Sequence, residues 1–354
     1  MDILIVKLSS LGDVVHAMPA VQDLRAARPG ARIDWVVERA FAPLVRRCEG
    51  VDRVIPLELR RWRRAPLAPA TRQEWRAFRQ ELQAQAYDAV IDLQGLTKSA
   101  LVARTARLAE GGRRYALANR TEGSSYEAPT RWIADVAVRV PARSHAVQRS
   151  RELCAAALGY ELPAQLRYGL HAEPHHNQDV PHRDQGVPDY EQRLPPHDQR
   201  EPHHHPGEPR PCIAFVHGSS REDKCWPQPH WIELGKKLVA EGFAIGLPHG
   251  SDAERRRSEG LAAAIGPHAQ VWPRLDLGVL ADRLAGCAGV IGVDSGLSHI
   301  AVALDLPHVQ IYNFDTAWRT GPEVPGVPQG RQRSVYGSPC PSLPAVWEAW
   351  RALG

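Results

Sequence analysis

The stretch GVIGVDSGLSHIAVALDLPHVQIY, residues 289–312, decides the fold class. Its apolar start, Gly289–Val293, predicts a buried strand, Gly296–Leu304 has the spacing of a helix, and His308–Tyr312 predicts a second strand. A strand, a helix and a strand in succession predict two parallel strands joined by a crossover helix. The segment DSGLSH therefore falls at the carboxyl end of a strand, where open α/β sheets bind their ligands.

The DSGLSH segment, Asp294–His299, has the composition of an anion-binding turn. The N-terminus of a helix offers unpaired backbone N–H groups and the positive end of the helix dipole. Gly296 lets the backbone approach an anion closely, and the hydroxyls of Ser295 and Ser298 add donors. A pyrophosphate suits these groups. An ordinary turn in which Asp294 caps the helix is the alternative for this segment taken alone.

A second polar loop, His217–Pro227, follows another predicted strand and should reach the same rim of the sheet. Ser219 and Ser220 can donate hydrogen bonds to a phosphate, and Lys224 can place a point charge on it. Glu254, just inside a predicted helix, can accept the hydroxyls of a ribose. The alternative is a solvated polar loop. Two such loops on one rim favour a nucleotide-diphosphate site in a domain that spans residues 212–354.

The N-terminal half shows the same alternation of strand and helix. Ile3–Lys7, Ile33–Val37 and Ala89–Leu93 predict buried strands, and Val14–Ala27 and Trp75–Ala86 predict helices. Buried strands alternating with helices predict a parallel sheet covered on both faces. The sequence thus predicts two α/β domains, the first spanning residues 1–168, and the tail 345–353 predicts an amphipathic helix that can pack on either.

Asp13 ends a turn, Ser9–Asp13, that follows the first strand and faces the cleft between the domains. A carboxylate can accept a proton from an attacking hydroxyl within hydrogen-bond reach. A carboxylate is also a preferred helix cap, and the helix dipole would lower its basicity. Spacing leaves both roles open.

Residues 169–211 are dense in Pro, His, Asp, Gln and Arg and poor in apolar residues. Such a segment cannot bury enough apolar surface to become ordered, which predicts a disordered linker between the domains. Its histidine clusters, His175-His176 and His203-His204-His205, fix no coordination geometry, so no metal site is predicted there.

Composition excludes several classes of protein. The chain has 354 residues, which favours two domains at about 150 residues each, and its 43% hydrophobic and 24% charged residues are ordinary for a globular protein. A formal charge of +4 is too small for a general nucleic-acid binder. The six cysteines include no CxxC pair, and neither a signal peptide nor an apolar stretch of about 20 residues is present, so a cytoplasmic location is predicted.

The cluster Arg60-Arg61-Trp62-Arg63-Arg64 is strongly basic. It can be a solvated loop or a nucleic-acid contact, but an anionic lipid or phosphorylated sugar acceptor suits a membrane-proximal enzyme best. Gln94–Ser99, which includes Lys98, follows a strand and can add contacts to the same acceptor. Arg120 lies in a polar stretch that can line the acceptor cleft.

These segments together resemble the heptosyltransferase I family, which has the GT-B fold of two Rossmann-like domains. The resemblance is carried by ILIVKLSSLGDVVHAMPA, IDWVVE, VIPLELRRWRR, YDAVIDLQGLTKSA, HAVQRSRELCAAALGY, HGSSREDKCWP, LPHG and DSGLSH, and it covers nearly everything except residues 169–211. It implies transfer of L-glycero-D-manno-heptose from ADP-heptose to Kdo of Kdo2-lipid A, with inversion and without a metal or other cofactor. The membrane partner it implies is the cytoplasmic face of the inner membrane, with no nucleic acid involved.

The resemblance also implies roles for individual residues. Asp13 takes the place of the catalytic base, Lys224 that of the phosphate-binding lysine, and Glu254 that of the ribose-binding carboxylate. The donor loop corresponds to Asp294, Ser295, Gly296, Leu297 and His299, beside Ser219 and Ser220. The acceptor patch corresponds to Arg60, Arg61, Arg63 and Arg64, with Lys98 and Arg120 near it. His16 and His249 receive no role from the sequence.

The sequence departs from the family pattern in two places: Ser295 stands where Thr is usual, which keeps the hydroxyl, and the linker is longer than a hinge needs. Rival functions are a second heptosyltransferase, a nucleotide-sugar epimerase, or a non-catalytic anionic-lipid-binding protein. An epimerase would need no Kdo2-lipid A, and a non-catalytic protein would release no ADP from ADP-heptose when the acceptor is present.

Overall fold

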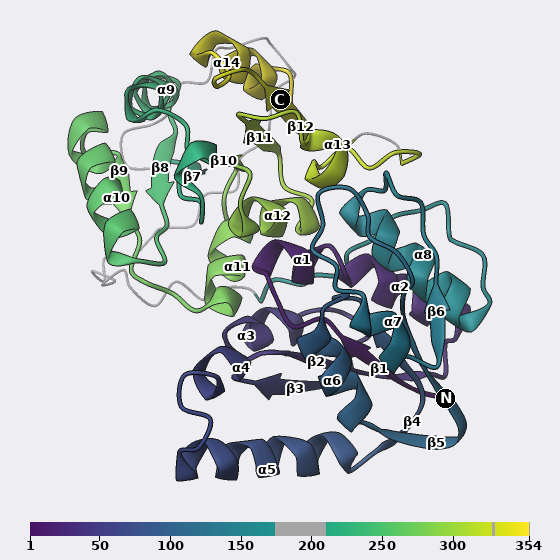
Figure 1. Cartoon of the computed structure of the whole chain (residues 1–354). Coiled ribbons are helices and arrows are strands. Elements are labelled where there is room, and N and C mark those ends of the chain that lie inside the picture. Colours follow the sequence, from purple (N-terminus) through teal and green to yellow (C-terminus); the bar gives the residue numbers. More distant parts are fainter. Residues whose placement is uncertain (174–209, 328–329, 354) are drawn as a thin grey trace, which may run out of the picture.

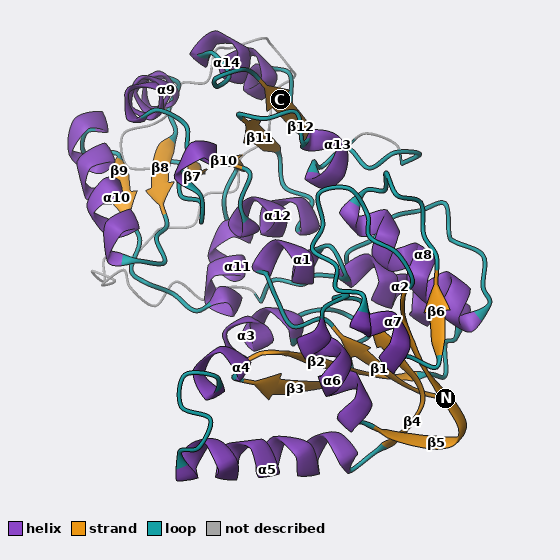
Figure 2. Cartoon of the chain, in the orientation of Figure 1, coloured by secondary structure: helices purple, strands orange, loops and turns teal. Residues whose placement is uncertain are grey.

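The computed structural model describes residues 1–173, 210–327 and 330–353, and it contains two parallel six-stranded sheets with helices on both faces (Figure 1 and Figure 2). The sheets confirm the predicted α/β class. Much of the predicted linker, with both histidine clusters, lies outside the described residues. None of the described helices has the length and apolar character required to cross a bilayer.

The first sheet has the strand order β3-β2-β1-β4-β5-β6. Its strands are β1 Asp2–Val6, β2 Arg32–Glu38, β3 Arg53–Leu57, β4 Ala86–Asp92, β5 Arg107–Leu117 and β6 Val136–Val138. Its helices are α1 Leu11–Val15, α2 Met18–Ala27, α3 Ala42–Val45, α4 Leu59–Trp62, α5 Pro69–Gln83, α6 Thr97–Thr105, α7 Pro129–Ile133 and α8 Ala146–Leu158. In Figure 1, α5 lies beneath this sheet while α2 and α8 lie above it.

The second sheet has the strand order β12-β11-β10-β7-β8-β9. Its strands are β7 Cys212–Val216, β8 Ala244–Leu247, β9 Ala269–Val271, β10 Gly289–Val293, β11 His308–Tyr312 and β12 Gln332–Tyr336. Its helices are α9 Gln228–Ala240, α10 Asp252–Ile265, α11 Leu277–Ala285, α12 Gly296–Ala303, α13 Ala317–Thr320 and α14 Leu343–Arg351. The C-terminal helix α14 packs on this sheet, against β11 and β12, and not on the first.

In both sheets, the order in which strands are added reverses at the first strand. The chain leaves β1 toward β2 on one side and later returns to β4 on the other, and β7 is flanked in the same way by β8 and β10. Ligands of open α/β sheets bind where the strand order reverses, at the carboxyl ends of the strands. The turns after β1 and β10 lie at these two points, so the topology brings Ser9–Asp13 and Asp294–His299 to facing positions.

The helix expected over Val14–Ala27 is two helices, and this expectation was wrong. α1 ends at Val15, and α2 begins at Met18 with Pro19 in its first turn. Proline has no N–H to donate within a helix but suits its first turn, so it favours a new start. The break directs His16 toward the second domain.

The two domains share a buried interface. One apolar cluster contains side chains from both, including Val14 of α1 and Ile300 of α12. The starts of α1 and α12 pack closely because both carry glycine: a Cβ on Gly12 would lie 2.7 Å from His299 Cδ2, and one on Gly296 would lie 2.7 Å from Leu11 Cβ. These glycines permit the close approach of the two helix starts.

Candidate active site

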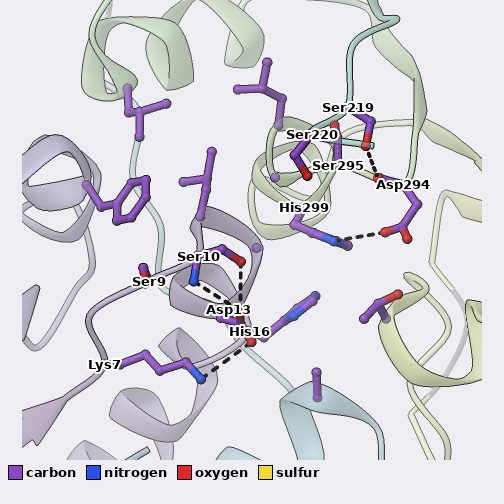
Figure 3. A pocket seen from close by; sticks show the side chains of 18 of the residues that line it. Lys7, Ser9, Ser10, Asp13, His16, Ser219, Ser220, Asp294, Ser295 and His299 are labelled. Atoms are coloured by element: carbon purple, nitrogen blue, oxygen red, sulfur yellow. Dashed lines mark hydrogen bonds and ion pairs between the residues drawn. The ribbon is translucent and has the colours of Figure 1, made fainter. Parts of the chain in front are cut away.

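A cavity of about 770 Å³ lies between the domains and is lined by side chains from both (Figure 3). Every predicted donor-site residue and Asp13 line it. The predicted residues on its wall are Asp13, Arg60, Lys98, Ser219, Ser220, Lys224, Glu254, Asp294, Ser295, Gly296, Leu297 and His299. The tertiary structure therefore brings together residues that are up to 286 positions apart, from Asp13 to His299.

Asp13 is the third residue of α1 and not its cap, which corrects one of the two readings of the sequence. The cap is Ser10, whose N–H and hydroxyl donate to Asp13 Oδ2 at 3.1 and 2.8 Å. These two hydrogen bonds hold the carboxylate at the start of the helix. The other oxygen, Oδ1, faces the cations Lys7 and Arg149.

Lys7 and Arg149 are site residues that the sequence reasoning missed. Lys7 is 2% exposed, its Nζ lies 3.6 Å from Asp13 Oδ1, and it donates to the Leu93 carbonyl at 3.0 Å. The terminal nitrogen of Arg149, on α8, lies 3.8 Å from the same oxygen. Burial alone would raise the pKa of Asp13, but Lys7, Ser10 and Arg149 together lower it to about 2. The carboxylate is therefore fully ionised near neutral pH. A lysine at the end of an apolar strand was the available signal for Lys7.

On the opposite wall, Asp294 holds two predicted donor-site residues. Lys224 Nζ donates to Asp294 Oδ2 at 2.5 Å, and His299 Nε2 lies 3.6 Å from Oδ1. Burial would raise the pKa of Asp294, but His299 and Lys224 hold it well below its usual range. The pair places the Lys224 ammonium beside the N-terminus of α12, where it adds to the positive end of the helix dipole.

The serines of DSGLSH differ in their roles. Ser298 is fully buried and donates to the Val293 carbonyl at 2.6 Å, so it serves the turn and not a ligand, contrary to expectation. Ser295 is one of the residues that line the cavity, and its Oγ is buried without a hydrogen-bond partner among the described residues. Buried hydroxyls normally have partners, so this orphaned group is suited to an incoming acceptor or donor atom of a ligand.

Glu254 lies in the first turn of α10, where Ser251 caps the helix. Its Oε2 accepts the Gly250 N–H at 2.7 Å. A Cβ on Gly218 would lie 2.8 Å from Glu254 Oε1, so glycine at 218 allows the carboxylate to reach the cavity. The other oxygen, Oε1, remains available for a ribose hydroxyl.

His16, which lines the cavity, and His145 lie at the interface between the domains. The ring of His16 lies 4.2 Å from that of His299 and 6.1 Å from that of His145, measured between centroids. Burial lowers the pKa of His16 well below its usual range and that of His145 to about 4. His145 accepts the Val147 N–H through Nδ1, so its Nε2 donates to the Gly321 carbonyl at 3.0 Å across the domain interface. His249 also lines the cavity.

Only some residues of the predicted basic patch line the cavity. Arg60 and Lys98 reach the cavity. Arg61 is paired with Glu58 and Glu74. The remaining members, Arg63, Arg64 and Arg120, are exposed and lie outside the cavity wall. Among the described residues, no group of three or more His, Cys, Asp or Glu side chains is arranged to hold a metal ion.

Two Rossmann-like domains facing across a ligand-sized cavity define the class of structure, which is a GT-B fold. A sequence model of the family described as glycosyltransferase family 9 (heptosyltransferase) matches residues 75–341. The chain belongs to glycosyltransferase family 9.

Individual relatives resemble the chain over almost its whole length. It is 37% identical to lipopolysaccharide heptosyltransferase 1 of Pseudomonas aeruginosa, covering 98% of this chain and 86% of that protein. It is 38% identical to lipopolysaccharide heptosyltransferase 1 of Escherichia coli K12, covering 92% and 90%. Lipopolysaccharide heptosyltransferase 2 of Salmonella typhimurium matches only 29% of this chain, at 35% identity.

A solved structure agrees with these matches. The E. coli heptosyltransferase WaaC with ADP superposes with a TM-score of 0.80 at 32% identity, and the match covers 100% of both chains. The same enzyme with ADP-2-deoxy-2-fluoro heptose gives a TM-score of 0.76 at 32% identity, with the same coverage.

Proposed function

We propose that the protein transfers L-glycero-D-manno-heptose from ADP-heptose to a Kdo residue of Kdo2-lipid A, with inversion and without a metal ion. The observation that carries the proposal is the placement of Asp13, ionised and held by Ser10, across one cavity from Lys224 and the start of α12. The first domain, residues 1–168, takes the acceptor, and the second, residues 212–354, takes the nucleotide sugar. The E. coli relative binds ADP and an ADP-heptose analogue, which supports this donor.

The donor lies along the second domain. Its diphosphate meets the free backbone N–H groups at the start of α12, the orphaned Ser295 hydroxyl and Lys224, while Glu254 Oε1 accepts a ribose hydroxyl. The Lys224 ammonium has three N–H groups and Asp294 takes one of them, so two remain for phosphate oxygens. Positive charge fixed at this position stabilises the departing ADP as its negative charge develops, which is the part a metal ion plays elsewhere.

The reaction is a direct displacement at the anomeric carbon. A Kdo hydroxyl oxygen forms the new bond, the bond from that carbon to the ADP oxygen breaks, and Asp13 accepts the hydroxyl proton. With a pKa of about 2, Asp13 is ionised at neutral pH and can accept a proton, but it is a weak base. It therefore takes the proton late, when the forming bond has made the hydroxyl strongly acidic. Attack from the face opposite ADP inverts the anomeric centre.

The enzyme acts at the inner face of the cell membrane as a peripheral protein. Arg63 and Arg64 are exposed, and Leu67, three residues further on, is 78% exposed. Cations beside an exposed apolar side chain suit a surface of anionic lipid. Co-sedimentation with vesicles containing anionic phospholipid tests this: binding should weaken with salt and in the variant Arg63→Ser/Arg64→Ser, and should be absent with neutral vesicles.

Release of ADP from ADP-heptose tests the proposed reaction. Release that requires Kdo2-lipid A supports it, and product of one added heptose should accumulate. Release or isomerisation without acceptor would indicate an epimerase, and use of only a heptose-bearing acceptor would indicate the second transferase. Membrane binding without any turnover would indicate a lipid-binding protein.

A further inference from the structure

Two arginines from different domains meet beside the proposed base. Arg149, on α8 of the first domain, is 7% exposed and lines the cavity. Arg319, on α13 of the second domain, lines the same cavity. The positive charge of Arg319 acts on Arg149: burial lowers the pKa of the Arg149 guanidinium, Asp13 opposes this, and Arg319 lowers it further. Two like charges held close together repel each other, so a bound anion between them would stabilise this arrangement.

The hydrogen bonds of the pair are incomplete. Arg149 donates to Thr121 Oγ1 at 3.0 Å, and its distance of 3.8 Å to Asp13 is too long for a hydrogen bond. Arg319 donates to the Gly123 carbonyl, and its Nε is buried without a hydrogen-bond partner in the part of the chain that the structure describes. A buried guanidinium nitrogen left unpaired is costly, so a ligand atom is expected to satisfy it.

The excess of positive charge around Asp13 also indicates a bound ligand. Lys7, Arg149 and Arg319 carry three positive charges here. Asp13 faces the first two, and the negative charge of Asp92 also acts on Lys7. The positive end of α12 and Lys224 already account for the diphosphate on the other wall. The excess of positive charge beside the base therefore suits a second anion, one carried by the molecule whose hydroxyl Asp13 deprotonates.

We infer that Arg149 and Arg319 form a subsite for the carboxylate of the acceptor sugar. The inference rests on the proposed function, in which the acceptor is Kdo, a sugar acid. Arginine presents paired N–H groups in a plane that matches a carboxylate, and Arg149 lies next to the base. A carboxylate bound here places the sugar so that one of its hydroxyls lies within reach of Asp13.

The subsite exists only when the domains are in this arrangement, since each supplies one arginine. Three contacts fix α13 on the first domain: Arg319 on the Gly123 carbonyl, His145 Nε2 on the Gly321 carbonyl at 3.0 Å, and Arg143 over the Trp318 ring at 4.3 Å. A Cβ on Gly123 would lie within 2.9 Å of three Arg319 atoms, and its φ of +66° favours glycine, so this position is shaped to receive the guanidinium. An acidic acceptor thus stabilises the closed arrangement that assembles base and donor.

The test pairs a change in the protein with a change in the acceptor. Initial rates are measured with Kdo2-lipid A and with the same acceptor after conversion of its carboxylates to methyl amides. For the wild-type enzyme, kcat/KM for the acceptor should fall about tenfold to a hundredfold on conversion, the range expected for hydrogen bonds to a charged group. For Arg319→Met, kcat/KM with the native acceptor should be about tenfold to a hundredfold below the wild-type value. Conversion of the carboxylates should lower the kcat/KM of this variant only slightly further. KM for ADP-heptose should be unchanged.

Arg319→Gln is the second variant, which keeps a polar side chain in place should the methionine disturb the docking of α13. Arg113→Met removes an exposed arginine outside the cavity and should respond to conversion as the wild type does. The inference is overturned if conversion lowers kcat/KM by the same factor in the wild type and in the Arg319 variants, because the arginine then does not bind the carboxylate. It is also overturned if the variants mainly raise KM for ADP-heptose, because the anion bound by Arg319 is then the donor phosphate. Absence of turnover by the wild type with native acceptor would overturn the proposed function and this subsite together.

Discussion

Replacement of Asp13 by Asn removes the proposed base but keeps the shape of the side chain. The variant keeps an oxygen that can accept from Ser10 but removes the negative charge that faces Lys7 and Arg149. General-base catalysis contributes about 10²–10⁴ in rate, so kcat should fall by about that factor while KM for ADP-heptose stays near the wild-type value.

The same change should lower stability by a predictable amount. Unit charges 3.6 Å apart, as for Lys7 and Asp13, attract by about 5 kcal/mol at an effective dielectric constant of about 20. Asp13 is half-buried, and Lys7 keeps its bond to the Leu93 carbonyl, so solvent and that bond offset much of the loss. We expect the free energy of unfolding to fall by about 1–3 kcal/mol, since Lys7 remains buried with less compensation.

Urea denaturation and initial rates measure the two effects on the same samples. The double variant Lys7→Met/Asp13→Asn should recover stability, because the uncompensated charge is gone, but should not recover turnover. Glu110→Gln, which removes an exposed carboxylate on β5, is the matched control and should change neither. Turnover of Asp13→Asn within about threefold of the wild type would refute the assignment of the base, and unchanged stability would refute the charge argument.

Three further predictions concern the surrounding residues. Lys224→Met should raise KM for ADP-heptose by about tenfold or more, as expected for loss of a charged phosphate contact, and a change in acceptor KM alone would contradict that role. Gly12→Ala should lower the melting temperature and the unfolding free energy by about 1–3 kcal/mol, because the new Cβ meets His299; Gly30→Ala, where nothing lies within 4 Å, should not. Burial raises the pKa of Asp92 to about 6, so the folded state keeps that proton to higher pH than the unfolded chain does, and the wild type should lose about 3 kcal/mol of unfolding free energy between about pH 4 and pH 6. Urea melts across that range should show the loss in the wild type and not in Asp92→Asn; equal slopes would contradict it.

The donor site was accessible to sequence reasoning because its parts are local. DSGLSH joins the end of a strand to the first turn of a helix, the apolar pattern identifies both elements, and the N-terminus of a helix favours anions. Lys224 and Glu254 follow neighbouring strands, so parallel topology alone places them on the same rim. The roles of these residues stay predictions that the kinetic experiments test.

The acceptor side depended on contacts that no local pattern encodes. Arg149 has the spacing of an ordinary helical residue, and Arg319 lies in a four-residue helix with no motif around it. Ser298 shares a motif with Ser295, but the Ser298 hydroxyl donates to the Val293 carbonyl within the turn, whereas the Ser295 hydroxyl has no partner among the described residues. Pro19 was visible in the sequence as a helix breaker, yet its effect on His16 follows only from how α1 meets α12.

The sequence by itself determined the two parallel sheets, their ligand-binding rims and the chemical character of the donor loop. These follow from hydrophobic periodicity and from the backbone geometry of strands and helix starts, which act over a few residues. The tertiary structure decided the charge state of Asp13, the partners of Arg60 to Arg64 and the meeting of Arg149 with Arg319. Electrostatic interactions act through space and depend on burial, so only the packed domains fix which charges lie beside one another.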